Sequence, residues 1–283
     1  MKLIAILLSA LMLMLAACSS TPGNAGSNSD AKPAASGKAQ PGQIPVEVKE
    51  SVLFSDGALD GYTTSEWDAS YETLKSQTRY SASGAMVEKV EFSYEEDKGL
   101  LGTKLVRDVE DRLKNRVVYQ YNGQGQLWKE TLVNKSGKPV SVYEYLYDAK
   151  GNRTSRTVSN GTGIKLAETL YTYNNKGLVV SSETRDGAGR KISSTTSEFD
   201  SQGNLVSQKV HNGAGEVATT INAVWENGRE IKNEQIGADG KVQIRVTNEF
   251  GANGELTRKT VENFQGQSVQ IVAYEYTFKP DKR

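Results

Sequence analysis

The chain has little of what most catalytic and metal sites are built from, with one cysteine and one histidine among 283 residues. A single cysteine forms no intramolecular disulfide and leaves no set of thiolates for a zinc site. Basic and acidic residues balance at 34 each and the pI is near 6.7, so the chain lacks the basic excess that attracts nucleic acid. We therefore expect no metal, no cofactor and no nucleic-acid partner, and the sequence nominates no catalytic residue.

The remaining candidates for chemistry are interpreted as turns. His211 lies beside Asn212 and is interpreted as a solvated turn residue rather than a catalytic base or a ligand. The segment Gly187-Ala188-Gly189 has no third glycine at the spacing of a dinucleotide-binding loop, and no Gly-Lys-Ser/Thr follows it. We expect a hairpin turn there, not a phosphate loop.

The amino terminus carries the signature of export. The cation Lys2 is followed by a largely apolar run over residues 3–17, which is shorter than the about 20 apolar residues that span a bilayer. The short run and its small terminal residues are typical of a cleaved signal peptide over residues 1–17. An uncleaved anchor helix is the alternative.

The segment Leu15-Ala16-Ala17-Cys18 resembles the lipobox of bacterial lipoproteins. The resemblance implies cleavage before Cys18, a diacylglycerol on its thiol and acylation of its new amino group. The protein would then be attached to the membrane through these lipids. Two or more acyl chains anchor a protein stably, whereas one chain binds only marginally. Ser19 follows in place of an aspartate-led retention signal, which favours the outer membrane in a cell that has one.

Residues 18–44 contain mostly Ser, Gly, Ala, Asn, Pro and Lys and no aromatic residue. This composition predicts a lipidated, disordered tether with an end-to-end distance of roughly 25 to 30 Å. The folded domain is expected over residues 45–283.

An aromatic residue recurs about every 26 residues through this domain. The nine positions are Trp67, Tyr94, Tyr121, Tyr147, Tyr173, Phe199, Trp225, Phe250 and Tyr276. We call them the anchors. A period of this length marks tandem units, each of which buries its apolar side only against its neighbours.

Two turns divide each unit. In the segment from Tyr147 to Gly151, Asp148 is placed to accept a backbone hydrogen bond and the glycine to take a positive φ, which predicts a type I turn with a bulge. A second turn, such as Asn160-Gly161-Thr162-Gly163, follows half a unit later. Two strands of roughly seven to nine residues remain, so each unit is expected to be a β-hairpin.

Two early segments depart from this pattern. Tyr71 stands where the first unit should have its turn glycine. Leu101, Leu105, Val109 and Leu113 are four residues apart, which leaves an amphipathic helix as an alternative. We favour strands, because the register of the units continues through this segment.

Alternation defines a candidate buried face. Side chains alternate between the two faces of a strand, so the anchors share a face with the residues two and four positions before them. This face is rich in tyrosine and becomes more polar in the middle units. The tyrosines are either a ladder of stacked core residues or a surface that holds a ligand: Tyr119, Tyr121, Tyr143, Tyr145, Tyr147, Tyr171, Tyr173, Tyr274 and Tyr276.

The Tyr-Asp-x-x-Gly unit, seen at Tyr147-Asp148-Ala149-Lys150-Gly151 and Phe199-Asp200-Ser201-Gln202-Gly203, resembles the YD repeat of bacterial RHS-type surface and toxin proteins. The resemblance implies a long, curling antiparallel sheet. An open twisted sheet rarely exceeds about 10 strands without curling. We therefore expect an all-β fold in which 16 to 18 strands form a curled or spiral sheet or an open barrel, not one embedded in lipid.

The lipid attachment at Cys18, the tether and the extended sheet together predict a non-catalytic lipoprotein of the cell envelope. Such a protein would present a repeat surface to a protein or polysaccharide partner. A structural accessory of an envelope assembly is the second hypothesis. An enzyme is the third.

Overall fold

A computed structural model describes residues 43–281, and all eighteen elements in that range are β-strands. The predicted signal peptide and Cys18, and the tether up to residue 42, lie outside the described residues. The strands are β1 (Gln43–Phe54), β2 (Leu59–Trp67), β3 (Leu74–Ser81), β4 (Met86–Tyr94), β5 (Leu101–Arg107), β6 (Leu113–Tyr121), β7 (Leu127–Asn134), β8 (Pro139–Tyr147), β9 (Arg153–Asn160), β10 (Lys165–Tyr173), β11 (Val179–Asp186), β12 (Lys191–Phe199), β13 (Leu205–Asn212), β14 (Val217–Glu226), β15 (Arg229–Gly237), β16 (Val242–Phe250), β17 (Leu256–Asn263) and β18 (Ser268–Pro280).

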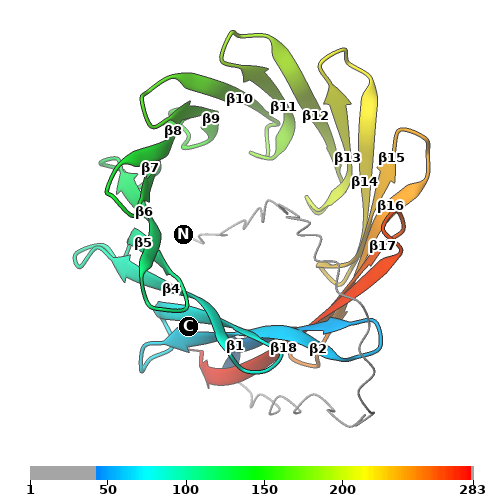
Figure 1. Cartoon of the computed structure of the whole chain (residues 1–283). Helices are drawn as coiled ribbons and strands as arrows, with labels where there is room; N and C mark the ends of the chain where they lie inside the picture. The colour runs from blue at the N-terminus through cyan, green and yellow to red at the C-terminus, as the bar shows by residue number, and fades with distance from the viewer. Residues whose placement is uncertain (1–42, 282–283) are drawn as a thin grey trace. The chain divides into compact units, whose positions relative to one another are not determined.

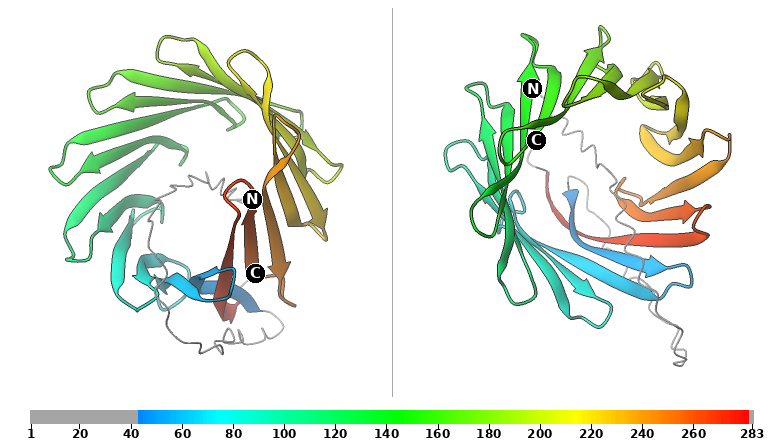
Figure 2. Two further views of the ribbon diagram at one scale, coloured as in Figure 1. Left: turned by 45° about the vertical axis from the view of Figure 1, so that its right-hand side comes forward. Right: turned by 45° about the horizontal axis from the view of Figure 1, so that its top comes forward.

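The sheet closes on itself. Each strand pairs antiparallel with the next, and β18 pairs with β1 from Gln43 opposite Pro280 to Phe54 opposite Gln270. Figure 1 shows the resulting ring, and Figure 2 shows β1 and β18 side by side in two further views. The predicted all-β sheet of antiparallel hairpins is confirmed, and it is a closed barrel rather than a spiral or open one, so no strand keeps an unpaired edge. None of residues 43–281 forms a helix long and apolar enough to span a bilayer.

The turns have the predicted chemistry. Asp148 Oδ1 accepts hydrogen bonds from the backbone N–H groups of Lys150 and Asn152, both at 2.9 Å, and Gly151 takes a φ of 85°. Tyr71, which replaces the glycine in the first unit, adopts the same left-handed conformation with a φ of 55°. The segment with the four-residue spacing is β5, a turn and the start of β6, so the strand prediction is confirmed.

A β-bulge follows each anchor. Tyr121 pairs with Leu127 while Gln120 pairs with Lys129, so Trp128 is left without a partner across the ladder. The same bulge recurs at Val48 in the β18–β1 pairing, although no turn joins those two strands. The closing pair of strands thus repeats the geometry of the other units.

The two faces of the sheet differ in burial. The anchor and the residues two and four positions before it are half-buried or buried in all nine units, whereas the residue directly before the anchor is exposed in eight of the nine. Side chains converge on the concave face of a barrel wall and diverge on its convex face, so the anchor face lines the interior. On the opposite face Val46, Val133, Ile271, Ser76 and Ser155 are only 4% to 7% exposed, so the anchor face is the more covered one along the second strand of each hairpin only.

Ionisable groups support this assignment. Burial raises the pKa of Glu47 and Glu50, which lie on the anchor face. On the opposite face, the hydrogen bond from Arg107 lowers the pKa of Glu91, and the hydrogen bond from Arg245 lowers that of Glu234. Desolvation thus dominates inside the barrel and ion pairing dominates outside it.

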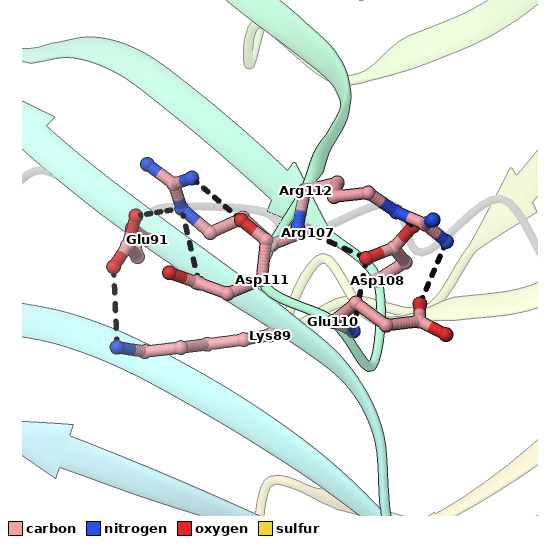
Figure 3. A network of polar contacts seen from close by, with 7 residues as sticks. All are labelled: Lys89, Glu91, Arg107, Asp108, Glu110, Asp111 and Arg112. Atoms are coloured by element: carbon pink, nitrogen blue, oxygen red, sulfur yellow. Dashed lines mark hydrogen bonds and ion pairs between the residues drawn. The ribbon is translucent and has the colours of Figure 1, made fainter.

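The outer face carries ion pairs that connect neighbouring strands. Figure 3 shows Glu91 between Arg107, at 2.8 Å, and Lys89, at 3.1 Å. Lys49 and Glu275 form a 2.8 Å pair across the β18–β1 seam. These side chains are about one-third exposed, so each pair contributes little to stability. The same face also exposes apolar residues, among them Leu146 and Val224.

Consecutive hairpins pack closely at their mid-unit turns. Gly161 lies against the backbone carbonyl of Pro139 at the start of β8, and a Cβ at this position would overlap that oxygen. Gly187 and Gly213 meet the carbonyls of Lys165 and Lys191 in the same way. These glycines are required by the close approach of the preceding hairpin and not by their own φ.

Candidate functional site

Most anchors make one recurring hydrogen bond. In seven of the nine units the anchor hydroxyl or indole N–H donates to the backbone carbonyl 20 residues earlier, at distances from 2.6 to 3.0 Å. The pairs are Trp67 to Glu47, Tyr94 to Leu74, Tyr121 to Leu101, Tyr147 to Leu127, Tyr173 to Arg153, Trp225 to Leu205 and Tyr276 to Leu256. We call this bond the aromatic clasp.

The clasp acts on the bulge of the preceding unit. Its acceptor is always the residue paired with the previous anchor, where the ladder is interrupted; for Tyr147 this residue is Leu127. A part-buried carbonyl at such an interruption needs another donor. Phe199 and Phe250 have no donor, and in the second case Asn248 Nδ2 binds the Glu230 carbonyl at 2.9 Å instead.

Four of the nine candidate tyrosines, Tyr121, Tyr147, Tyr173 and Tyr276, are therefore clasp residues. Their rings do not stack on one another. The one stacked ring pair in the described part of the chain, Tyr62 with Tyr80, belongs to the outer face. The anchors thus link each hairpin to the bulge before it.

The other five candidate tyrosines, Tyr119, Tyr143, Tyr145, Tyr171 and Tyr274, lie on the interior face without a clasp bond. Tyr145 is only 7% exposed, and its hydroxyl donates to Glu130 Oε1 at 2.8 Å. Burial raises the pKa of Tyr145 and Tyr274, and it raises that of Tyr119 to about 12. These phenols therefore stay neutral at physiological pH and can donate a hydrogen bond.

Two arginines share the interior face with these tyrosines. The guanidinium carbon of Arg153 lies 4.5 Å from the ring centroid of Tyr145, and that of Arg156 lies 5.8 Å from the ring of Tyr143. Both arginines are half-buried, and in each the Nε atom is buried without a hydrogen-bond partner. We call Tyr143, Tyr145, Arg153, Arg156 and Tyr171 the arginine–tyrosine wall.

Sequence reasoning missed this pairing of arginines because of the bulge. Residues three apart point to opposite faces of a regular strand, so Arg153 and Arg156 are expected on different sides. Thr154 is the extra residue of the bulge after Tyr147, and it returns Arg156 to the face of Arg153. The recurring position of the bulge was the signal that would have located both.

A second ionisable group of the interior lies at the seam. Glu47 is paired with Tyr276 and Glu50 with Tyr274 across β1 and β18. Burial raises the pKa of Glu50, and the positive charge of Lys259 offsets part of this increase. Burial and the charge of Glu47 raise the pKa of Tyr276.

Along β10 to β12, beside the wall, the interior face carries hydroxyl groups. Thr169 and Thr184 share a 3.0 Å hydrogen bond, and Ser182 and Thr195 share one of 2.8 Å. These hydroxyl pairs belong to the more polar middle units and lie beside the arginine–tyrosine wall along the sheet.

His211 is half-buried in β13, one residue before the turn, and its Nδ1 atom has no hydrogen-bond partner. Its cross-strand neighbours are Ser194 and Val217. Within residues 43–281, no group of three His, Cys, Asp or Glu side chains is placed to hold a metal ion.

No family model and no curated protein matches the chain. Among solved structures, it is similar to a porin-like protein from Bacteroides uniformis, with 10% identity, 82% of this chain and 98% of the other covered, and a TM-score of 0.44. A porin-like protein from Bacteroides vulgatus matches at 9% identity over 83% and 99% of the two chains, with a TM-score of 0.33. The Tc holotoxin pore of Photorhabdus luminescens matches at 12% identity and a TM-score of 0.31 over 82% of this chain, which spans 16% of that one. Likenesses this weak carry no functional argument.

Proposed function

We propose that this chain is a non-catalytic lipoprotein of the cell envelope that binds an extended partner, a polysaccharide or a protein, on the interior face of its barrel. The observation that carries the proposal is the arginine–tyrosine wall, where large amphipathic side chains line a concave surface. Tyrosine offers an apolar ring and a polar hydroxyl together, which suits it to recognition surfaces.

The division of the tyrosines supports this proposal. The clasp accounts for Tyr147 and Tyr173 as structural residues, but no clasp bond accounts for Tyr143 or Tyr171. Rings that the fold does not use for its own backbone remain available for a partner. Binding is therefore assigned to the tyrosines other than the anchors.

The ion pairs of the outer face support a barrel surrounded by water. Ion pairs such as Arg245 with Glu234, at 2.8 Å, and Arg258 with Glu249, at 3.7 Å, lie on that face. A cationic side chain facing lipid at the bilayer midplane costs about 2 to 4 kcal/mol. The membrane contact in this proposal is the lipid on Cys18, with the barrel held outside the bilayer.

Binding by the full chain to a panel of envelope polysaccharides and envelope protein extracts tests the proposed function. We expect at least one saturable partner whose affinity falls in a Tyr143→Ala, Tyr171→Ala double variant. Tyr80→Ala, on the outer face, is the matched control and should bind as the unaltered chain does. Absence of saturable binding across the panel, or equal losses in the control, would reject the proposal.

Membrane fractionation tests the lipid attachment at Cys18 separately. Cys18→Ala removes the thiol to which the lipid would be attached, so the protein should move from the membrane fraction to the soluble fraction. The matched control is Ser19→Ala, which keeps the cysteine and should remain with the membrane. Retention of the Cys18→Ala variant in the membrane would reject lipid anchoring at this residue.

A further inference from the structure

The two arginines of the wall lack a carboxylate partner. Neither Arg153 nor Arg156 forms an ion pair in the described part of the chain, although both are half-buried. Charged side chains that leave solvent are ordinarily paired, because unpaired burial costs the lost hydration. An anion from outside the described chain would meet that need.

The carboxylates on the neighbouring strands do not provide it. Glu130 is the carboxylate of β7 on the interior face, and it already accepts the hydroxyl of Tyr145 at 2.8 Å. Glu144 of β8 and Glu168 of β10 both pair with Thr157 of β9. All three side chains lie on the outer face, away from the arginines. The wall therefore has a net positive charge of its own.

The tyrosine rings prepare the guanidinium groups for an anion. Cation–π contact with Tyr145 and Tyr143 covers a flat face of each guanidinium and restricts its side chain. The N–H groups project from the edge of the plane, in the fork geometry that matches a carboxylate. Both Nε atoms are buried and have no acceptor within the described chain, so an external anion would be bound by the other N–H groups of each guanidinium.

The closed sheet decides against an extended peptide as the main partner. Peptides commonly bind a sheet by adding a strand to its edge, and here every strand from β1 to β18 has two neighbours. Strand addition is therefore closed to a peptide partner, and recognition on the interior face of the sheet depends on side chains. The tyrosine rings and the adjoining hydroxyl pairs Thr169–Thr184 and Ser182–Thr195 offer apolar faces and hydroxyl partners, the complements of a sugar ring.

We propose that the arginine–tyrosine wall binds a carboxylate-bearing polysaccharide, with Arg153 and Arg156 donating to the acidic groups and the half-buried rings of Tyr143 and Tyr171 lying against the sugars. This inference rests on the proposed function and names its partner class.

The test measures binding of the full chain to polygalacturonate by calorimetry, with the methyl ester of the same polymer as the uncharged counterpart and polyphosphate as a different anion. We expect saturable binding of polygalacturonate that weakens as salt rises, and much weaker binding of the ester. Loss of a charge-assisted contact predicts at least about a tenfold fall in affinity for Arg153→Gln, Arg156→Gln. Arg116→Gln removes an exposed, outward arginine and should leave affinity unchanged.

Circular dichroism establishes that each variant is folded. If the double variant fails to fold, Arg156→Lys takes its place, since it keeps the charge but loses the planar fork and should still weaken binding. Affinity unchanged by Arg156→Lys in that case would overturn the inference.

Equal binding of polygalacturonate and its ester would overturn the acidic-sugar inference while leaving a tyrosine-dependent glycan-binding function in place. Binding of polyphosphate without polygalacturonate would also overturn it, as would an equal loss in Arg116→Gln. A protein partner found in the wider panel, with no polysaccharide bound, would reject this inference and leave the proposed function standing.

Discussion

The aromatic clasp makes a quantitative prediction for Tyr147→Phe. This substitution keeps the ring and removes only the hydroxyl, which donates to the Leu127 carbonyl at 2.6 Å. The bond is at the short end of the range for O–H···O geometry, and its acceptor lies at the bulge after Tyr121, where the ladder is interrupted. The change therefore leaves a part-buried carbonyl without its donor.

The expected loss follows from hydrogen-bond energetics. A typical intramolecular hydrogen bond contributes about 0.5 to 1.5 kcal/mol, and an unsatisfied buried acceptor costs about 1 to 3 kcal/mol. Because the Leu127 carbonyl is only part-buried, we expect a loss of about 1 to 2 kcal/mol. In a domain of this size each kcal/mol corresponds to a fall in Tm of about 2 to 4 °C.

One anchor without a hydroxyl allows the reverse substitution. Phe199 occupies the anchor position without a hydroxyl, so Phe199→Tyr should supply the missing donor to the Val179 carbonyl, 20 residues earlier, and raise Tm. Tyr143→Phe is the matched control, because Tyr143 lies on the same strand and face as Tyr147 but its hydroxyl makes no hydrogen bond within residues 43–281.

Thermal unfolding followed by circular dichroism measures all three variants. We expect a lower Tm for Tyr147→Phe, a higher Tm for Phe199→Tyr and little change for Tyr143→Phe. An equal loss in the control and in Tyr147→Phe, or no change in either anchor variant, would show that the clasp does not stabilise the barrel.

Three further predictions concern packing and charge. Gly161→Ala places a Cβ against the Pro139 carbonyl and should destabilise the barrel by about 1 to 3 kcal/mol in urea unfolding. Gly123→Ala, at the corresponding turn position with nothing within 4 Å, should be nearly neutral, and equal effects would contradict the packing argument. Burial raises the folded-state pKa of Glu47, so its stabilising contribution is fully present below the unfolded pKa and is lost as pH rises through the folded value. Glu47→Gln should therefore raise Tm at pH 7.5 and lose this advantage near pH 4; no gain at pH 7.5 would refute the burial argument. The hydrogen bond from Arg107 lowers the folded-state pKa of Glu91, so its contribution is present above the unfolded pKa and is lost as pH falls through the folded value. Glu91→Gln should lower Tm slightly at pH 7 in low salt, and a loss that persists undiminished in 1 M salt would contradict an electrostatic origin.

The hairpins and their turns were predictable because their causes are local. An Asx side chain and a glycine a few residues later specify the turn, as Asp148 and Gly151 show. Tyr71 follows the same backbone path with a left-handed φ although it is not a glycine, which shows that the register outweighs the preference of one residue. The 26-residue period therefore predicted strand number and the covered face.

The candidate site was only partly predictable. The tyrosines were found from their spacing, but the clasp was not, since its donor and acceptor are 20 residues apart and meet only when adjacent hairpins pack. Simple alternation places Arg153 and Arg156, three residues apart, on different faces. The bulge at Thr154 brings them together, and alternation does not count the extra residue of a bulge.

By itself, the sequence determined the repeating unit, its turns and the face that carries the aromatic residues, because each depends on contacts within one or two units. The tertiary structure alone decided that the sheet closes, since the pairing of residues 43–54 with 270–280 depends on the twist summed over nine hairpins. Closure in turn made one face concave. That curvature crowds the tyrosines and the two unpaired arginines into a common interior, where burial raises the pKa of Tyr119 to about 12 and leaves both arginine Nε atoms without an acceptor.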